Sequence, residues 1–330
     1  MARGKNTHGG ILRGKAMENG MKNQTLPRFM RPENPKKRVR KIKDDNILSK
    51  RTKGDKVLFG VVFGLFTFYA ATLAFALLWM LMTSFKPSTD DFGFALPSEW
   101  LIGNYSDAFT MLNAGDGTTD FFGMIFNSLW YTAAVTALGV IMPCITGYVM
   151  SKYNFAGKNV MFTVAITSMM IPVVGNMASS MKLAGELGIY DTPLFPVLSS
   201  LGGFGGSFLV YYGFFKSVSW AYAEAAQIDG ANPFTVFFVI MLPQAVPIMM
   251  TYAITNAIFN WNEYQTILLY LPSYPTLASG LFDYKAQADR LGNIPVYFAG
   301  LIISMIPTIV LFSAFSSKVM TSLSVGGLKG

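Results

Sequence analysis

Four polar side chains in the mainly apolar segment 244–271 have a spacing that makes them candidates for binding chemistry. Tyr252, Asn256, Asn260 and Glu263 follow one another at intervals of four, four and three residues, so on a helix they share one face. Such groups in a membrane-spanning helix face the protein interior or a wet cavity. They can bind a polar solute, or they can hold neighbouring helices together. Glu263 could also relay protons in an ion-driven carrier, but no clear basic partner for it lies in the apolar segments.

A short polar segment between two apolar runs has the composition of a helix that ends at glycine. It reads Glu224-Ala225-Ala226-Gln227-Ile228-Asp229-Gly230. Ala225 and Ala226 favour helix, and Gly230 can take the left-handed conformation that closes one. Asn232 can then cap a second helix that has Pro233 at its first position, where a missing N–H costs nothing. The pattern predicts helix, glycine turn and helix over residues 220–242. It is either an ordinary helical hairpin or a rigid protrusion that another protein binds.

The residue types that serve most enzyme chemistry are scarce. The chain has one histidine, His8, and one cysteine, Cys144, which excludes a disulfide framework, a cysteine-based metal site and histidine-based catalysis. Gly157-Lys158 is followed by asparagine, whereas a nucleotide-binding glycine loop needs Ser or Thr there. The glycine cluster at 202–206 follows no predicted strand, which argues against a dinucleotide site. We therefore expect no enzyme activity, no metal and no cofactor on this chain.

The composition predicts an all-α, polytopic membrane protein. Of the 330 residues, 52% are hydrophobic and 13% are charged, whereas a soluble domain has about 25% charged residues. A membrane-spanning helix needs about 20 apolar residues. Six stretches qualify, at about 57–85, 121–150, 160–181, 195–215, 244–271 and 294–315. The fourth contains the glycine cluster, so we expect it to pack against other helices rather than lipid.

The distribution of charge predicts the orientation of these spans. Of the 26 Lys and Arg residues, 17 lie in residues 1–56, a stretch with few large apolar residues that is predicted to be a largely disordered tail. Because cytoplasmic loops are enriched in Lys and Arg, this tail and the connections that carry Lys152, Lys158 and Lys216 belong on the cytoplasmic side. Both termini of the cell-membrane protein are then cytoplasmic. The tail is expected to contact anionic lipid rather than nucleic acid, since a basic flank beside a first span is usual.

Short motifs from about residue 80 onward occur in an order that is typical of one family. The pieces are Phe85-Lys86-Pro87, Asn104-Tyr105, Asn127-Ser128-Leu129, the connection with Tyr148, Lys152, Tyr153, Phe155 and Gly157, then Met170-Ile171-Pro172, Leu187-Gly188-Ile189-Tyr190-Asp191-Thr192, the segment from Glu224 to Gly230, Trp261-Asn262-Glu263-Tyr264, Thr276-Leu277-Ala278-Ser279-Gly280-Leu281 and Gly326-Gly327-Leu328-Lys329-Gly330. In this order the chain resembles the permease subunits of carbohydrate ABC importers of the maltose type, and in particular the smaller subunit of the permease pair.

The resemblance implies a type I importer permease fold, with a permease domain over residues 57–318 and a short cytoplasmic tail over 319–330. It implies that the loop 219–243 docks on an ATPase subunit through Glu224, Ala225, Ala226 and Gly230, with Asp229 as a cap or a further contact. It also implies a second permease, an ATPase dimer that carries ATP and Mg, and an external solute-binding protein that delivers a sugar. The pathway for that sugar would then run along Tyr252, Asn256, Asn260 and Glu263.

The chain departs from this family in two places. The basic tail is longer than is usual, and Val218-Ser219 stands where the family has Ile-Pro just before the docking loop. Two alternatives to a sugar permease are a permease for a non-sugar solute and an ATP-independent secondary carrier. A carrier should show inverted or repeated segments, and none is visible in the sequence.

Overall fold

The computed structural model describes residues 53–112, 119–171 and 175–326, with side chains as far as residue 315. Every regular element in these ranges is a helix, which confirms the predicted all-α class. The chain divides into two units, residues 1–72 and 73–330, and the second unit contains the end of helix α2 and all later helices. Most of the predicted basic tail, residues 1–52, lies outside the described residues.

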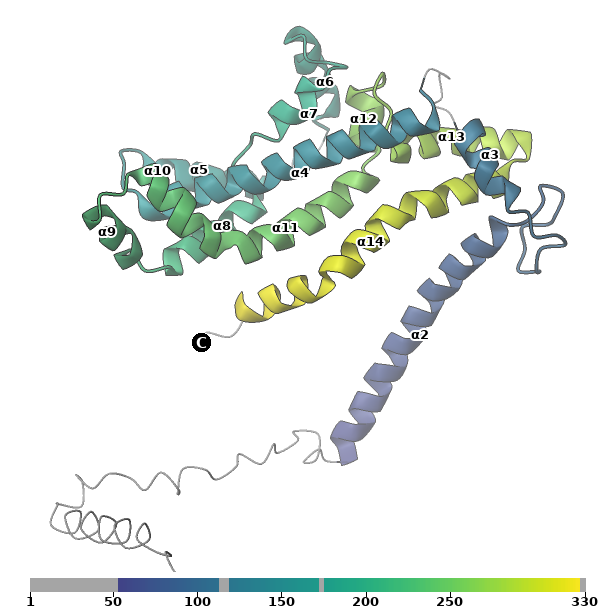
Figure 1. The fold of residues 1–330 in the computed structure, drawn as a ribbon, viewed down its shortest axis with the longest axis horizontal. Coiled ribbons are helices and arrows are strands. Elements are labelled where there is room, and N and C mark those ends of the chain that lie inside the picture. Colours follow the sequence, from purple (N-terminus) through teal and green to yellow (C-terminus); the bar gives the residue numbers. More distant parts are fainter. Residues whose placement is uncertain (1–52, 113–118, 172–174, 327–330) are drawn as a thin grey trace, which may run out of the picture. The chain divides into compact units, whose positions relative to one another are not determined.

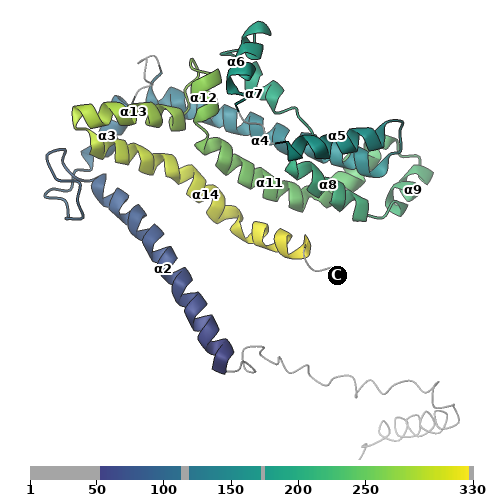
Figure 2. The ribbon, with the colours of Figure 1, turned by 180° about the vertical axis from the view of Figure 1, so that it is seen from behind.

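Four helical stretches among the described residues are long and apolar enough to cross a membrane. They are α2 (Lys53–Thr83), α4 (Phe121–Lys152), the continuous stretch Pro233–Asn262, and α14 (Ile294–Gly326). Helices α4, α11 (Leu242–Asn262) and α14 lie side by side in Figures 1 and 2. Helix α14 continues to Gly326, into the segment predicted as a C-terminal tail.

The third and fourth predicted spans are each divided into two shorter helices. The third consists of α5 (Lys158–Met170) and α6 (Met177–Glu186), which flank Pro172, a residue outside the described ranges. The fourth consists of α7 (Leu194–Ser199) and α8 (Gly206–Ser217), which flank the glycine cluster. Ile171 and Gly205 have extended backbone angles, so α5 ends before Pro172 and α8 begins only after the glycine cluster. A count of six membrane segments agrees with this arrangement.

Helix α8 packs against α4 at very short range, because glycines stand at the points of closest approach. A Cβ atom on Gly147 would lie 2.7 Å from Cβ of Tyr211, and one on Gly203 would collide with the Thr146 side chain. Thr146 Oγ1 also donates a hydrogen bond to the carbonyl of Gly203 (2.5 Å). Small residues allow such close packing of helices in a membrane. The expectation that the glycine-rich segment packs against another helix is confirmed.

In the second unit, three helices lie toward the end opposite α8. They are α3 (Gly103–Met111), α12 (Gln265–Tyr270) and α13 (Leu277–Leu291), as Figures 1 and 2 show. Thr276 and Ser279 form a capping box at the start of α13, and the Leu277 N–H donates to Ser128 Oγ of α4 (2.8 Å). Trp261 Nε1 donates to the Ser304 carbonyl (3.0 Å), which ties α11 to α14. These bonds connect the long helices at this end.

Candidate functional sites

The predicted docking segment forms helix α9 (Ala221–Ile228) and ends at a glycine turn, as the sequence indicates. Gly230 has φ of +86°, in the left-handed region. Its N–H donates to the Gln227 carbonyl (3.0 Å), and the Ala231 N–H donates to the Ala226 carbonyl (2.8 Å). This pair of bonds is the Schellman motif, which satisfies the last carbonyls of a helix. The turn at Gly230 is therefore held by its own backbone hydrogen bonds.

The helix after this turn runs without a break into the fifth span. Asn232 Oδ1 accepts from the Thr235 N–H (2.8 Å), so Asn232 caps α10 (Pro233–Thr235) with Pro233 in the first turn, as predicted. The π-helical turn η3 (Val236–Met241) then leads directly into α11. The long apolar helical stretch thus begins at Pro233, inside the predicted docking loop 219–243, and runs to Asn262. One short turn, residues 229–232, therefore separates α9 from the helical stretch that contains α11.

Most of the predicted docking residues lie on the surface of α9. Glu224, Ala225, Asp229 and Gly230 are exposed. Ala226 is half-buried against a cluster of buried side chains that includes Tyr148, Tyr211, Phe215 and Phe237. Ala226 therefore packs partly within the chain, and a docking role for it stays a prediction.

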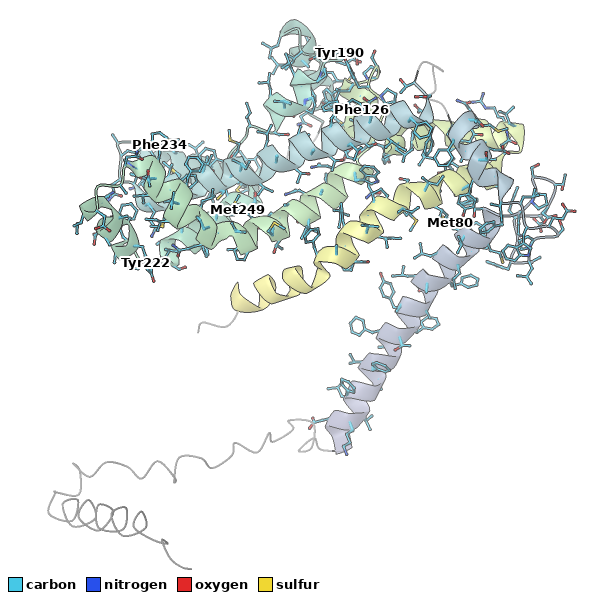
Figure 3. The ribbon with its side chains drawn as sticks, in the orientation of Figure 1. Met80, Phe126, Tyr190, Tyr222, Phe234 and Met249 are labelled. Atoms are coloured by element: carbon cyan, nitrogen blue, oxygen red, sulfur yellow. The ribbon has the colours of Figure 1, made fainter. Side chains whose placement is uncertain are left out.

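Two large apolar side chains on this surface are not among the docking residues predicted from the sequence. Ile228 is 86% exposed and Phe234 is 75% exposed. Figure 3 shows Phe234 and Tyr222 at the same end of the unit, on α10 and α9. The sequence gives one indication of this role: Ile228 and Phe234 are large apolar residues inside an otherwise polar connection. Exposed apolar residues at such a position are typical of a protein–protein contact.

Lys152, at the end of α4, holds the junction between α8 and α9. Its Nζ donates to the Val218 carbonyl (2.5 Å) and lies 5.9 Å from the centre of the Trp220 ring. Val218 and Trp220 are the residues that end α8 and begin α9. The lysine therefore bonds the junction at Val218-Ser219, where the sequence departs from the family pattern, and restrains the direction in which α9 leaves α8.

An apolar groove of about 410 Å³ runs beside the docking segment. The α4 side is formed by Ile145, Tyr148 and Val149, and the other side by Phe234 and Phe237. Its lining is aromatic and aliphatic, so it could take up an apolar side chain of a neighbouring protein.

The four polar residues predicted to line a pathway have different environments. Asn260 is buried, and its Nδ2 donates to Thr136 Oγ1 of α4 (3.1 Å), so it joins two helices. Tyr252 packs against the Tyr211 ring, with 5.5 Å between ring centres. Asn256 is half-buried, and within the described part of the chain its side chain makes no hydrogen bond. Of the four, Asn256 has the side chain best suited to a polar solute.

Glu263 lies at the point where α11 ends. Helix α11 ends at Asn262, and Glu263 has extended backbone angles (φ −73°, ψ 119°). Its Oε1 accepts from the Thr266 N–H (3.0 Å), in the first turn of α12. Glu263 is therefore the C-cap of α11, and its place on the predicted face stays a prediction. The described residues contain no group of three His, Cys, Asp or Glu side chains that could hold a metal ion.

The chain matches a protein family over residues 139–319, more than half its length. The family is described as the binding-protein-dependent transport system inner membrane component. The chain belongs to this family. It is a multi-pass membrane component of a transport system and not an enzyme, which confirms both predictions.

Individual relatives agree with this assignment. The chain is 29% identical over 269 residues to a probable ABC transporter permease protein, YurM, of Bacillus subtilis, covering 79% of this chain and 86% of that protein. It is 29% identical over 276 residues to the arabinooligosaccharides transport system permease protein AraQ of Halalkalibacterium halodurans, covering 80% and 94%. A bacterial ABC transporter that imports the acidic polysaccharide alginate contains a chain of the same fold, with a TM-score of 0.65, 20% identity, and coverage of 81% of this chain and 98% of that one. The predicted importer permease fold is confirmed.

Proposed function

We propose that this chain is the permease subunit of an ATP-driven importer for a sugar or oligosaccharide. The family depends on a binding protein, which favours an importer over an ATP-independent carrier. A relative that covers most of the chain is named for arabinooligosaccharide transport, which favours a sugar over another solute. In this proposal a second permease, an ATPase dimer that carries ATP and Mg, and an external binding protein complete the complex.

The observation that carries the coupling part of the proposal is the docking segment itself. Glu224 and Ala225 on α9, and Asp229 at its C-cap, are exposed, and the two ends of this helix are restrained by Lys152 at the start and by the Gly230 turn at the end. Because α9 leads directly into α11, a push on α9 by the ATPase would move the helix that carries Tyr252 and Asn256. ATP-driven closure of the ATPase dimer would thereby change access to the solute pathway.

Charge reversal on α9 tests this proposal. In the complete transporter reconstituted with its binding protein, Glu224→Lys should lower sugar uptake and the ATP hydrolysis that the loaded binding protein stimulates. Binding of that protein to the outer face should remain. The matched control is Glu186→Lys, an exposed acid on α6 whose carboxylate lies 3.8 Å from Lys182 Nζ. Equal uptake and stimulated hydrolysis in Glu224→Lys and the wild type would contradict the docking assignment.

A further inference from the structure

The connection between α2 and α3 is a closed loop built around a buried lysine. The Leu101 N–H donates to the Phe85 carbonyl (2.8 Å), which joins the two ends of the loop. Lys86 is fully buried, and its Nζ donates to the carbonyls of Asp91 (2.8 Å) and Gly93 (2.9 Å). A buried ammonium group needs such partners, and these carbonyls fix the course of the loop. Met80 marks the end of α2 before this loop in Figure 3.

Further hydrogen bonds hold the same loop. The buried Asn104 amide donates to the carbonyls of Ser84 and Lys86, both at 2.9 Å. The Asp90 carboxylate accepts from the N–H (2.8 Å) and the hydroxyl (2.7 Å) of Ser98, and these bonds lower the pKa of Asp90. The loop is therefore a preformed unit on which surface side chains are held in place.

The loop returns along α2 to the depth of the membrane boundary. The apolar part of α2 begins at Val57, and about 20 residues cross the hydrocarbon core, so the core ends near Ala76. The ring of Phe94 packs on the ring of Phe75, with 5.3 Å between centres. Counted from Val57, the middle of the loop thus lies beside α2 within one turn of the end of the hydrocarbon core.

The side chains that the loop exposes at this level are large and apolar. Phe94 and Leu96 are each 73% exposed, Trp100 is 61% exposed and Ile102 is 74% exposed. Aromatic residues are enriched at the boundary between membrane and water, where their rings suit the headgroup region. The only cation of residues 84–105 is the buried Lys86, whereas the acids Asp91 and Glu99 are exposed. Attraction to anionic lipid would therefore not hold the loop in place.

We propose that residues 92–102 form an interfacial membrane anchor, inserted into the lipid leaflet at the C-terminal end of α2. The insertion is apolar and does not depend on lipid charge. It fixes the depth of α2 and the starting point of α3, which packs on α14. The proposal requires only that α2 spans the membrane, and it is independent of the solute and of the ATPase.

Spin labels test this proposal directly, because Cys144 is the only native cysteine and Cys144→Ala removes it. In that background, labels go on Leu96→Cys and Ile102→Cys. Leu73→Cys on α2 serves as a hydrocarbon reference, and Thr89→Cys serves as a reference on the exposed turn after α2. The full chain, with the subunits that copurify with it, is placed in nanodiscs of phosphatidylcholine, with and without phosphatidylglycerol. Collision with oxygen, which concentrates in lipid, is compared with collision with a water-soluble nickel complex.

We expect the ratio of oxygen to nickel accessibility at residues 96 and 102 to be several-fold above that at residue 89 and below that at residue 73. The ratio should not change with the lipid mixture. A ratio equal to that at residue 89 would overturn the anchor, because the loop would then lie in water. Low accessibility to both reagents would also overturn it, because another protein would then cover the loop. If Leu96→Cys fails to assemble, Ile102→Cys alone decides between these outcomes.

Discussion

At the scale of single residues, Gly230 is constrained by its backbone alone. Its φ is +86°, and an added Cβ would meet no atom within 4 Å, so a side chain there is disfavoured by conformation and not by collision. A residue with a β-carbon pays about 1–2 kcal/mol for this conformation. Gly230→Val should therefore weaken binding of the ATPase by up to about thirtyfold, as measured by titration of the purified subunits.

Two variants control for this effect. Gly230→Asn should bind nearly as well as the wild type, since asparagine tolerates the left-handed region. Gly213→Ala, on α8 with ordinary φ and free space for a methyl group, should have no effect. Wild-type affinity in Gly230→Val would show that the turn does not set the docking geometry.

Asn256 and Asn260 lie one helical turn apart on α11 and should respond differently to the same change. Asn260→Leu breaks the bond to Thr136 and leaves that buried hydroxyl without its partner, at a cost of about 1–3 kcal/mol. We expect lower thermal stability and less assembled complex. Asn256→Leu should leave assembly unchanged and lower sugar uptake. Uptake by both variants is measured per assembled complex, and unimpaired uptake in Asn256→Leu would remove that residue from the proposed pathway.

Residue spacing predicts the positions of some of the four polar residues on α11, but not their environments. Intervals of four residues place Tyr252, Asn256 and Asn260 on one helix, which the structure contains. The spacing does not show that α11 ends at Asn262, or that Glu263 accepts a hydrogen bond from Thr266 in the first turn of α12. It also cannot distinguish a side chain that bonds a neighbouring helix from one that faces a cavity.

At the scale of helices, the direction of α9 depends on Lys152. Where the family has a proline, this chain has Ser219, and the junction lacks the restriction on φ that proline supplies. The bond from Lys152 to the Val218 carbonyl and the contact with the Trp220 ring provide a restraint of another kind. A hydrogen bond to a charged group contributes about 1.5–3 kcal/mol.

Lys152→Met should therefore uncouple transport: stimulated ATP hydrolysis continues while sugar uptake per ATP falls several-fold. Lys152→Arg keeps a cationic donor, so it should restore most of the sugar uptake per ATP hydrolysed. A general loss of structure at this position would not be rescued in this way. The matched control is Lys158→Met, because Lys158 Nζ bonds only within its own connection, to the Tyr153 carbonyl (2.9 Å) and Asn154 Oδ1 (3.3 Å). An unchanged ratio of uptake to hydrolysis in Lys152→Met would contradict this role.

Helix boundaries are predictable from the sequence where they depend on local chemistry. The glycine turn after α9 and the Asn232-Pro233 start of α10 follow from residues within one turn of each other. The sequence does not predict the divided third and fourth segments or the start of the fifth at Pro233. The glycine break between α7 and α8 is stabilised by the contact of Gly203 with Thr146 of α4, a pair that is distant in sequence. A hydropathy pattern cannot predict a contact between residues so far apart in the sequence.

At the scale of the whole molecule, the charge distribution predicts which loops face each side. In the Cys144→Ala background, Thr89→Cys should react with an impermeant maleimide added outside intact cells. Asn154→Cys, exposed between α4 and α5 beside Lys158, should react only after the cells are opened. The reason is the enrichment of Lys and Arg in cytoplasmic loops. The reverse pattern would overturn the orientation and place α9 on the wrong side for an ATPase.

The chain should transport nothing by itself. Its sequence contains no glycine loop that ends in Gly-Lys-Ser or Gly-Lys-Thr, so no ATP site of that kind can drive the movement of α11. In vesicles that contain the chain alone, we expect neither ATP hydrolysis nor sugar flux above protein-free vesicles. Addition of the second permease, the ATPase and the loaded binding protein should restore both together. Sugar uptake by the chain alone under an ion gradient would instead support a secondary carrier, and the restrained docking helix would then need another explanation.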